Sequence, residues 1–173
     1  MLKKMKSSKK RARLLENFSA KYPEILSDLN SNSYDLFQTI ARVLELDDIS
    51  YNALSNKSLE FRGNGGLKID MNFKDGGFDY VAMVGSIMSF KLAGVEPHYL
   101  AYSIFEAFGD MVISVLGQLK REFKIDNFIL MGDMFENSVL FSRILSKFQI
   151  SKPYFSKEIA LDYKLKVKNE KLK

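Results

Sequence analysis

Apolar residues recur at helical spacing along most of the chain. The longest such stretch runs from Pro97 to Phe123, where apolar side chains three and four residues apart form one broad face and Pro97 suits a first helical turn. Shorter stretches with the same period predict helices at about 9–20, 23–29, 35–47, 51–61 and 79–92. The pattern therefore predicts a chain that is rich in helices.

Apolar runs that suit strands are short and few. They lie at 67–73, 128–131 and 152–155, and a last helix is predicted at 159–167. Glycine-rich stretches at 63–66 and 75–77 mark turns, and the first of them lacks the Lys-Ser/Thr pair of a Walker phosphate loop. Many helices with about three short strands indicate a helix-rich α/β class, and they are typical of a piece of a larger fold.

The stretch 127–140 combines a strand, a turn and a helix. An apolar run ends at Gly132, and a helical pattern that includes Val139 and Leu140 begins within a few residues. A turn of this kind points backbone N–H groups and the positive end of a helix dipole at whatever lies above it, so it can hold a phosphate. Many α/β proteins contain the same turn for packing alone, and both interpretations stay open at this point.

Basic residues are concentrated at the two ends of the chain. They are Lys3, Lys4, Lys6, Lys9, Lys10, Arg11 and Arg13 at the start and Lys164, Lys166, Lys168, Lys171 and Lys173 at the end. Without these cations and Glu170, 14 basic and 20 acidic residues remain, so the body carries about −6 although the whole chain carries +5. Such ends are typical of solvated termini, and contact with RNA, a membrane or an acidic partner is the alternative.

The composition narrows the possible chemistry. The absence of cysteine excludes disulfides, thiolate catalysis and cysteine-ligated metals, and the single histidine, His98, excludes a His-rich metal site. With 46% hydrophobic residues, the 173-residue chain can bury a core as one domain. The first 13 residues lack the apolar core of a signal peptide, and no window of membrane-spanning length is free of charge. We therefore expect a cytoplasmic protein with no membrane insertion.

Four segments carry a family resemblance. They are LFQTIARVLELDDISY at 36–51, GVEPHYLA at 94–101, LMGDMFENSVL at 130–140 and, more weakly, PYFSKEIALDY at 153–163. In this order they resemble LFDAVAALLG…VSYEG, GVSPAEIA, LSGGVFQNRLL and PPNDGGISLGQ in the C-terminal half of the carbamoyltransferase domain of HypF-type hydrogenase maturation proteins. Those proteins are related to the enzymes that make threonylcarbamoyladenosine on tRNA and share the actin-like, sugar-kinase-like ATPase fold. The resemblance implies the C-terminal half of that fold, rich in helices and with few short strands.

The turn at Gly132 departs from the family motif. In SGGVFQN the glycine pair lets the backbone approach nucleotide phosphates, whereas here Gly132 is followed by Asp133, whose carboxylate and Cβ both oppose a phosphate. Phe135 and Asn137 are kept, and Glu136 stands where a neutral amide is usual. The resemblance thus implies that Gly132, Asp133 and Asn137 are the remnant of a nucleotide-binding site.

Other family positions are also altered. The family segment Tyr-Glu-Gly-Glu, which helps to hold the nucleoside, is replaced here by Tyr51, Asn52, Ala53 and Leu54. The family's metal-binding aspartate and the glycines after it are replaced by Ser156, Lys157 and Glu158. A family histidine in the long helix is replaced by Phe105. The half-domain that carries the paired histidine ligands and the first phosphate loop has no counterpart in this chain. The resemblance therefore implies no catalytic residue, no metal ligand and no resident cofactor.

Three functions remain open. The first is a HypF-like protein that binds hydrogenase subunits or maturation proteins and does not catalyse a reaction. This interpretation favours a protein that is not an enzyme. The second is half of a carbamoyltransferase that uses ATP or carbamoyl-adenylate and is completed by another chain carrying the missing half-domain. The third is an RNA-binding accessory protein, which the acidic body and the lack of a recognition motif disfavour.

The chain divides into three predicted parts. Residues 1–33 form a basic N-terminal extension with short helices, 34–163 form the HypF-like partial carbamoyltransferase domain, and 164–173 form a basic tail. A half-domain of this kind is expected to expose an apolar surface where a partner would pack, and hence to self-associate.

Overall fold

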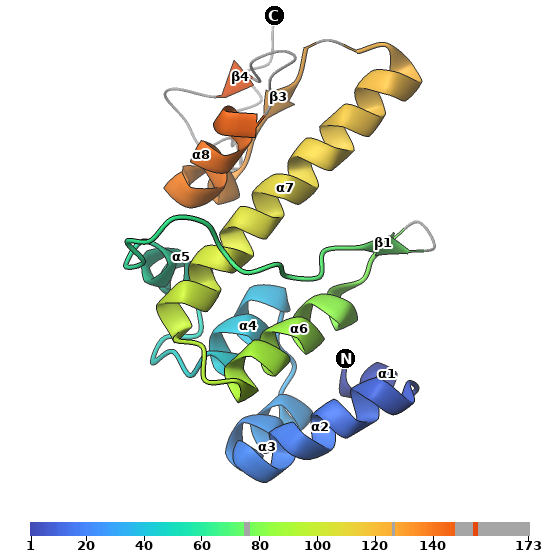
Figure 1. Cartoon of the computed structure of the whole chain (residues 1–173), viewed down its shortest axis with the longest axis vertical. Coiled ribbons are helices and arrows are strands. Elements are labelled where there is room, and N and C mark those ends of the chain that lie inside the picture. The colour runs from blue at the N-terminus through green and yellow to red at the C-terminus, as the bar shows by residue number, and fades with distance from the viewer. Residues whose placement is uncertain (75–76, 126, 148–153, 156–173) are drawn as a thin grey trace, which may run out of the picture.

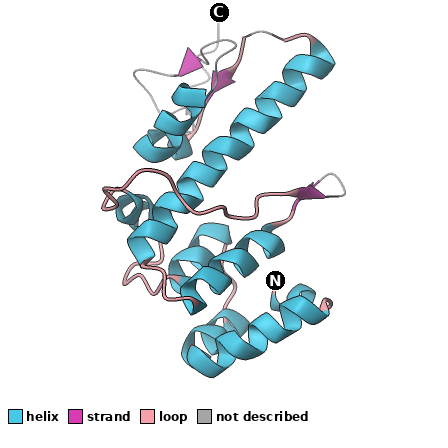
Figure 2. Ribbon diagram, viewed as in Figure 1, coloured by secondary structure: helices cyan, strands magenta, loops and turns pink. Residues whose placement is uncertain are grey.

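The computed structural model of the chain describes residues 1–74, 77–125, 127–147 and 154–155 (Figure 1). Helices dominate these residues (Figure 2). They are α1 Leu2–Met5, α2 Lys9–Lys21, α3 Pro23–Ser31, α4 Leu36–Val43, α5 Tyr51–Ser58, α6 Tyr80–Leu92, α7 Pro97–Phe123, the 3-10 helix η1 Asp133–Glu136, and α8 Ser138–Lys147. The strands are β1 Phe73–Lys74, β2 Gly77–Phe78, β3 Ile129–Leu130 and β4 Tyr154–Phe155. The predicted helix-rich class with few short strands is confirmed.

The long helix α7 crosses the molecule diagonally, and other elements pack along it (Figure 1). Helices α5, α6 and α8 contact α7, and α4 contacts α5 and α6. The buried residues of α7 lie mainly between Leu100 and Gly109, with Leu116 further along. The N-terminal half of α7 is therefore the centre of the core.

Capping residues explain where several helices begin and end. Helix α7 has the predicted bounds, with Pro97 in its first turn and Lys124 in the left-handed region at φ 57° after its last. Helix α4 begins after Asp35, which forms a reciprocal capping box with Gln38, and it ends before the predicted 47 because Glu45 adopts φ 58°. Helix α5 is also shorter than predicted and ends at Ser58.

The predicted strand at 67–73 is wrong except for Phe73. Residues 67–72 form no strand with any described residue, and two of their backbone donors bind helix side chains. Leu67 N donates to Ser103 Oγ at 2.9 Å, and Asp70 N donates to Ser86 Oγ at 3.2 Å. Phe73 and Lys74 pair antiparallel with β2 across the predicted turn.

The other strands are shorter than predicted. β3 pairs in parallel with β4, with Ile129 opposite Tyr154 and Leu130 opposite Phe155. The remainder of the predicted strand at 152–155 and the predicted helix at 159–167 lie outside the described residues.

The N-terminal helices pack into the molecule. Helix α2 lies across α6, and the core includes Met5, Leu15, Phe18 and Ile25 from α1 to α3. The basic residues of α2 lie among these apolar positions in sequence and remain mostly exposed. The core includes residues on both sides of residue 33. The proposed division at residue 33 stays a prediction.

Helix α7 is also the one helix in the described part of the chain that is long and apolar enough to cross a membrane by length and composition. Of its most apolar window, 44% is buried inside the molecule. The cytoplasmic location stays a prediction.

Candidate functional site

The turn that begins at Gly132 follows β3 directly. Gly132 adopts φ 117° and ψ 151°, a region that favours glycine over residues with a Cβ. The single helical turn of η1 comes next, and α8 begins at Ser138. The predicted order of strand, turn and helix is confirmed, with η1 inserted between the turn and the helix.

Asn137 connects this turn to helix α5. Its side chain is only 2% exposed, and its Oδ1 accepts hydrogen bonds from Val139 N and Leu140 N, both at 3.1 Å. Its Nδ2 donates to Ser55 Oγ at 2.8 Å and to Ser58 Oγ at 3.0 Å. Asn137 therefore caps α8 and anchors it to α5, and two of the first amides of α8 are bound within the protein.

A second contact between η1 and α5 is made by a tyrosine. Tyr51 Oη donates to the Met134 carbonyl oxygen at 3.3 Å. Burial raises the pKa of Tyr51, a hydrogen bond with Ser55 opposes this shift, and the carboxylates of Glu136 and Asp133 raise the pKa further. The turn thus presents negative charge, which disfavours an anion close to it.

These contacts bear on the predicted remnant of a nucleotide site. Asp133 is exposed and Gly132 is half-buried, so both are accessible, while Asn137 is buried with its polar atoms bound inside the protein. Nucleotide binding by Gly132, Asp133 and Asn137 stays a prediction. The geometry gives Asn137 a structural role that the motif alone did not indicate.

Helix α8 crosses α7 at Gly109. A Cβ on Gly109 would lie 2.8 Å from Arg143 Cγ and 3.3 Å from the Leu140 carbonyl oxygen, so this position needs a residue without a side chain. Arg143 then reaches back over α7, and its guanidinium donates to both carboxylate oxygens of Asp110 at 2.7 Å. The hydrogen bonds from Arg143 lower the pKa of Asp110, and those same bonds raise the pKa of Arg143.

Glu106 joins three segments at the same junction. It accepts hydrogen bonds from Arg143 Nη1 at 3.1 Å, from Tyr102 Oη at 3.3 Å and from Gly66 N at 2.6 Å. Burial raises the pKa of Tyr102, and the charge of Glu106 raises it further. The loop at 66, helix α7 and helix α8 are thereby held together by one carboxylate.

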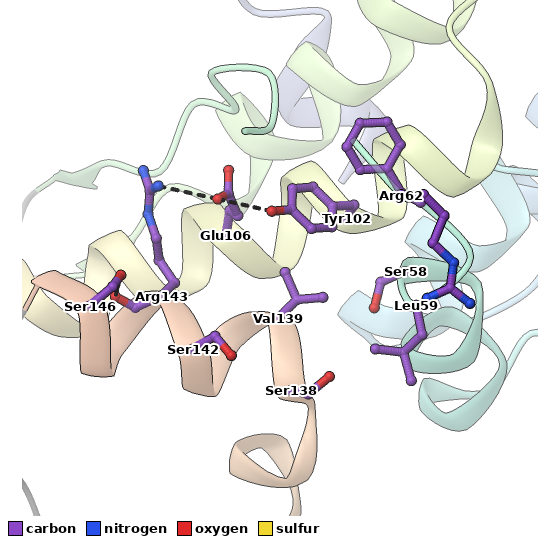
Figure 3. Close-up of a pocket in the computed structure, with 11 residues that line it drawn as sticks. Ser58, Leu59, Arg62, Tyr102, Glu106, Ser138, Val139, Ser142, Arg143 and Ser146 are labelled. Atoms are coloured by element: carbon purple, nitrogen blue, oxygen red, sulfur yellow. Dashed lines mark hydrogen bonds and ion pairs between the residues drawn. The ribbon is translucent and has the colours of Figure 1, made fainter. Parts of the chain in front are cut away.

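A cleft of about 410 Å³ lies beside this junction, between the end of α5, α7 and α8 (Figure 3). Hydroxyls from Ser58, Ser138, Ser142 and Ser146 line it, together with Arg62, Tyr102, Glu106 and Arg143. Figure 3 shows Arg143 and Tyr102 both reaching Glu106. Arg62 makes no hydrogen bond or ion pair to the described part of the chain, so it is the free cation of this cleft.

The groups that line the cleft can bind a ligand. Hydroxyls and one free guanidinium can hold a small polar or anionic group. The described residues contain no group of three His, Asp or Glu placed to hold a metal ion. The sequence shows Glu106 and Asp110 as an i,i+4 pair on one helix. It did not predict the junction, because their partner Arg143 lies 33 residues beyond Asp110.

The other residues considered from the sequence lie in the core, beside the cleft or outside the described chain. Phe105 is fully buried in the core, and its ring contacts that of Tyr51 at 5.9 Å between centroids. His98 lies beside Phe61, with ring centroids 6.1 Å apart. Ser156, Lys157 and Glu158 lie outside the described residues.

Comparison with known proteins found one solved structure with a similar fold and one protein with a similar sequence. No family model matches the chain. The fold is similar to that of full-length HypF in the phosphate- and nucleotide-bound form, with a TM-score of 0.62 and 14% identity over 84% of this chain. The sequence is similar to that of protein HydE of Wolinella succinogenes, with 29% identity over 98 residues, or 54% of this chain.

These matches cover only part of the two larger proteins. The chain spans 22% of the HypF chain and 18% of HydE. The predicted resemblance to HypF-type proteins is confirmed at the level of the fold. The assignment to the actin-like ATPase fold stays a prediction.

Proposed function

We propose that this chain is a HypF-like protein that takes part in hydrogenase maturation through contacts with other proteins rather than through carbamoyl transfer. The observation that carries the proposal is the pairing of a HypF-like fold over 84% of the chain with a turn whose helix amides are bound by Asn137. The similarity to HydE over 54% of the chain supports the same relation.

The charge of the turn also favours contacts over chemistry. Asp133 stands directly after Gly132, where the family motif has a second glycine, and Glu136 adds a further carboxylate to η1. A nucleotide phosphate beside these two carboxylates would meet like charge. The partners proposed are hydrogenase subunits or other maturation proteins.

Calorimetry with ATP and carbamoyl-adenylate, with and without divalent metal, tests the absence of nucleotide chemistry. We expect no micromolar binding to the unaltered chain. An Asp133→Gly variant restores the family glycine and serves as the comparison, since any gain in affinity would report on the turn alone. Metal-dependent micromolar binding by the unaltered chain would contradict the proposal.

Affinity purification of the tagged chain from its source organism tests the partner class. We expect hydrogenase subunits or maturation proteins to be enriched above a control purification with an unrelated tagged protein. If hydrogenase activity and subunit processing in a deletion strain equalled those of the parent, a maturation role would be untenable.

A second function is favoured by exposed apolar side chains at the far end of α7, in β3 and directly after β3. Phe123 is 63% exposed, Ile129 is 68% exposed and Met131 is 56% exposed. Exposed large apolar side chains can mark a surface that another chain covers. The alternative is therefore half of an ATP- or carbamoyl-adenylate-dependent carbamoyltransferase, completed by a chain that supplies the remaining half-domain.

Co-purification also separates this alternative from the first function. A partner chain bearing paired metal-binding histidines, lost on Phe123→Glu/Ile129→Glu substitution, would favour the completed enzyme. Self-association of the isolated chain is expected if the surface stays uncovered, and light scattering measures it. A monomer at all concentrations, with no such partner, would count against the completed enzyme.

A further inference from the structure

A basic groove runs between helices α2 and α6. Helix α2 packs across α6, and a Cβ on Gly85 would lie 3.7 Å from Leu14 Cδ2, in ordinary contact. The extended chain at 68–70 follows the other side of the groove, held by the hydrogen bond from Asp70 N to Ser86 Oγ. The volume of this open groove is about 900 Å³, against about 410 Å³ for the cleft of Figure 3.

Basic side chains outnumber acidic ones in the lining of this groove. Lys10, Arg11, Arg13 and Lys68 contribute four positive charges, and Asp70 contributes the one carboxylate among the lining residues. Arg11 is paired with Asp79 at 3.3 Å, and Asp79 also caps α6 by accepting a hydrogen bond from Ala82 N. The other three cations have no ion pair with any described residue. Their charge is therefore available to a ligand.

The free cations differ from three basic residues elsewhere in the molecule that are held in ion pairs. Arg42 is paired with Asp28, Lys91 with Glu45, and Arg143 with Asp110 and Glu106. Three unpaired cations facing one groove repel one another, and an anionic ligand would relieve that repulsion.

The base of the groove is apolar. Ala82 and Gly85 are buried, and Leu14 and Phe90 are half-buried, whereas Lys10, Arg13 and Lys68 are exposed. An apolar floor within a charged rim is the usual anatomy of a protein interface. A nucleic-acid strand would instead call for several exposed aromatic faces for stacking, and Phe90 is the one aromatic ring in the lining.

We propose that the groove between α2 and α6 binds an acidic segment of a partner protein, whose carboxylates meet Lys10, Arg13 and Lys68 and whose apolar side chains enter the floor. The volume lies within the range of about 300–1,000 Å³ typical of ligand sites, which suits a short stretch of extended chain. The groove does not depend on the role in hydrogenase maturation, because it is argued from charges and contacts of α2 and α6 alone.

Fluorescence anisotropy of the full chain with a labelled peptide that alternates Glu with Leu and Ala tests the proposal. We expect saturable binding that weakens as salt rises, since exposed charges are screened over about 10 Å at 0.1 M. The same peptide with Gln in place of Glu is expected to bind at least about tenfold more weakly. Equal binding of the two peptides, or no binding of the acidic one, overturns the proposal.

Matched variants locate the site. Lys10→Glu/Arg13→Glu is expected to weaken binding about tenfold or more, because two attractive contacts become repulsive. Lys3→Glu/Lys9→Glu makes the same change in net charge on exposed residues that do not line the groove, and it is expected to change the affinity by less than about threefold. Equal losses in the two variants would show a non-specific charge effect and overturn the site.

A neutral block tests the floor separately. Ser89 is exposed and lines the groove, so Ser89→Trp fills the space without a change in charge. We expect binding to be lost while the thermal unfolding curve, followed by circular dichroism, stays unchanged. Retained peptide binding in this variant, or a single-stranded oligouridine that binds the unaltered chain more tightly than the acidic peptide, overturns the acidic-segment assignment.

Discussion

The junction of α5, α7 and α8 and the groove between α2 and α6 use polar residues in opposite ways. At the junction, Asn137, Glu106 and Arg143 have their polar atoms bound by other parts of the chain. In the groove, Lys10 and Arg13 carry charges that no described residue neutralises. Satisfied polar groups stabilise a fold, whereas unpaired exposed charges add little to it and are free to meet a partner. Substitutions should therefore destabilise the protein at the junction and leave its stability nearly unchanged in the groove.

The largest effect is expected at Asn137. Asn137→Ala removes a helix cap and leaves the amides of Val139 and Leu140 and the hydroxyls of Ser55 and Ser58 without their partner. The free energy of unfolding should fall by about 3 kcal/mol, measured by urea denaturation. Asn137→Asp keeps the capping oxygen and should lose less. If Asn137→Ala unfolded at the same urea concentration as the unaltered chain, the structural role of Asn137 would be wrong.

A smaller loss is expected at Arg143. Arg143→Leu removes the bonds to Asp110 and Glu106 and should cost about 2 kcal/mol, since hydrogen bonds to charged groups contribute about 1.5–3 kcal/mol and this site is partly exposed. Lys147→Leu is the matched control, because Lys147 contacts the same Asp110 from a position that is 48% exposed. That control should cost less than about 0.5 kcal/mol. Equal costs in the two variants would mean that the junction is no more than a surface ion pair.

The junction should also respond to acid. Hydrogen bonds from Arg143 lower the pKa of Asp110 in the folded state, so the stability from this carboxylate is complete above its unfolded pKa of about 3.9 and is lost as pH falls through the folded pKa. The difference in free energy of unfolding between the unaltered chain and Asp110→Asn should stay constant at neutral pH. It should then shrink as pH falls below about 4. A difference that widened on acidification would have the opposite sign and would refute the assignment.

The smallest effect is expected in the groove. Lys10→Gln/Arg13→Gln should change the free energy of unfolding by less than about 0.5 kcal/mol, because neither side chain has an ion pair with a described residue. Arg11→Gln is the comparison within the same helix, since it breaks the pair with Asp79 and should cost more. A loss above about 1 kcal/mol in the double variant would make these cations structural and remove the contrast between the two regions.

Local pattern predicted the helices well and the strands poorly. Helix α7 could be bounded from sequence because Pro97 and the apolar period are local signals. The strand predicted at 67–73 was mostly wrong, since whether its amides meet a neighbouring strand or Ser103 and Ser86 depends on residues far away in sequence. Alternation of apolar and polar residues indicates an extended chain, but it does not identify what the chain pairs with.

The candidate site shows the same limit. The motif around Gly132 predicted the turn correctly, but the partners of Asn137 lie 82 and 79 residues earlier in the chain, beyond any local pattern. The basic residues of α2 were interpreted as a solvated end, and their relation to Lys68 becomes visible only once α2 packs on α6. A sequence reports the charge of a residue, whereas the fold decides whether that charge has a partner.

Asn137 also has a consequence for the order in which the molecule opens. The first turn of a helix is usually where amide protons exchange with solvent most readily, because it has no intrahelical acceptors. The amides of Val139 and Leu140 are instead bound to a side chain that is itself held by Ser55 and Ser58 of α5. Hydrogen exchange at these two positions should therefore be slow and should accelerate only when α5 and α8 separate, so that the beginning of α8 reports on the integrity of a helix far away in sequence.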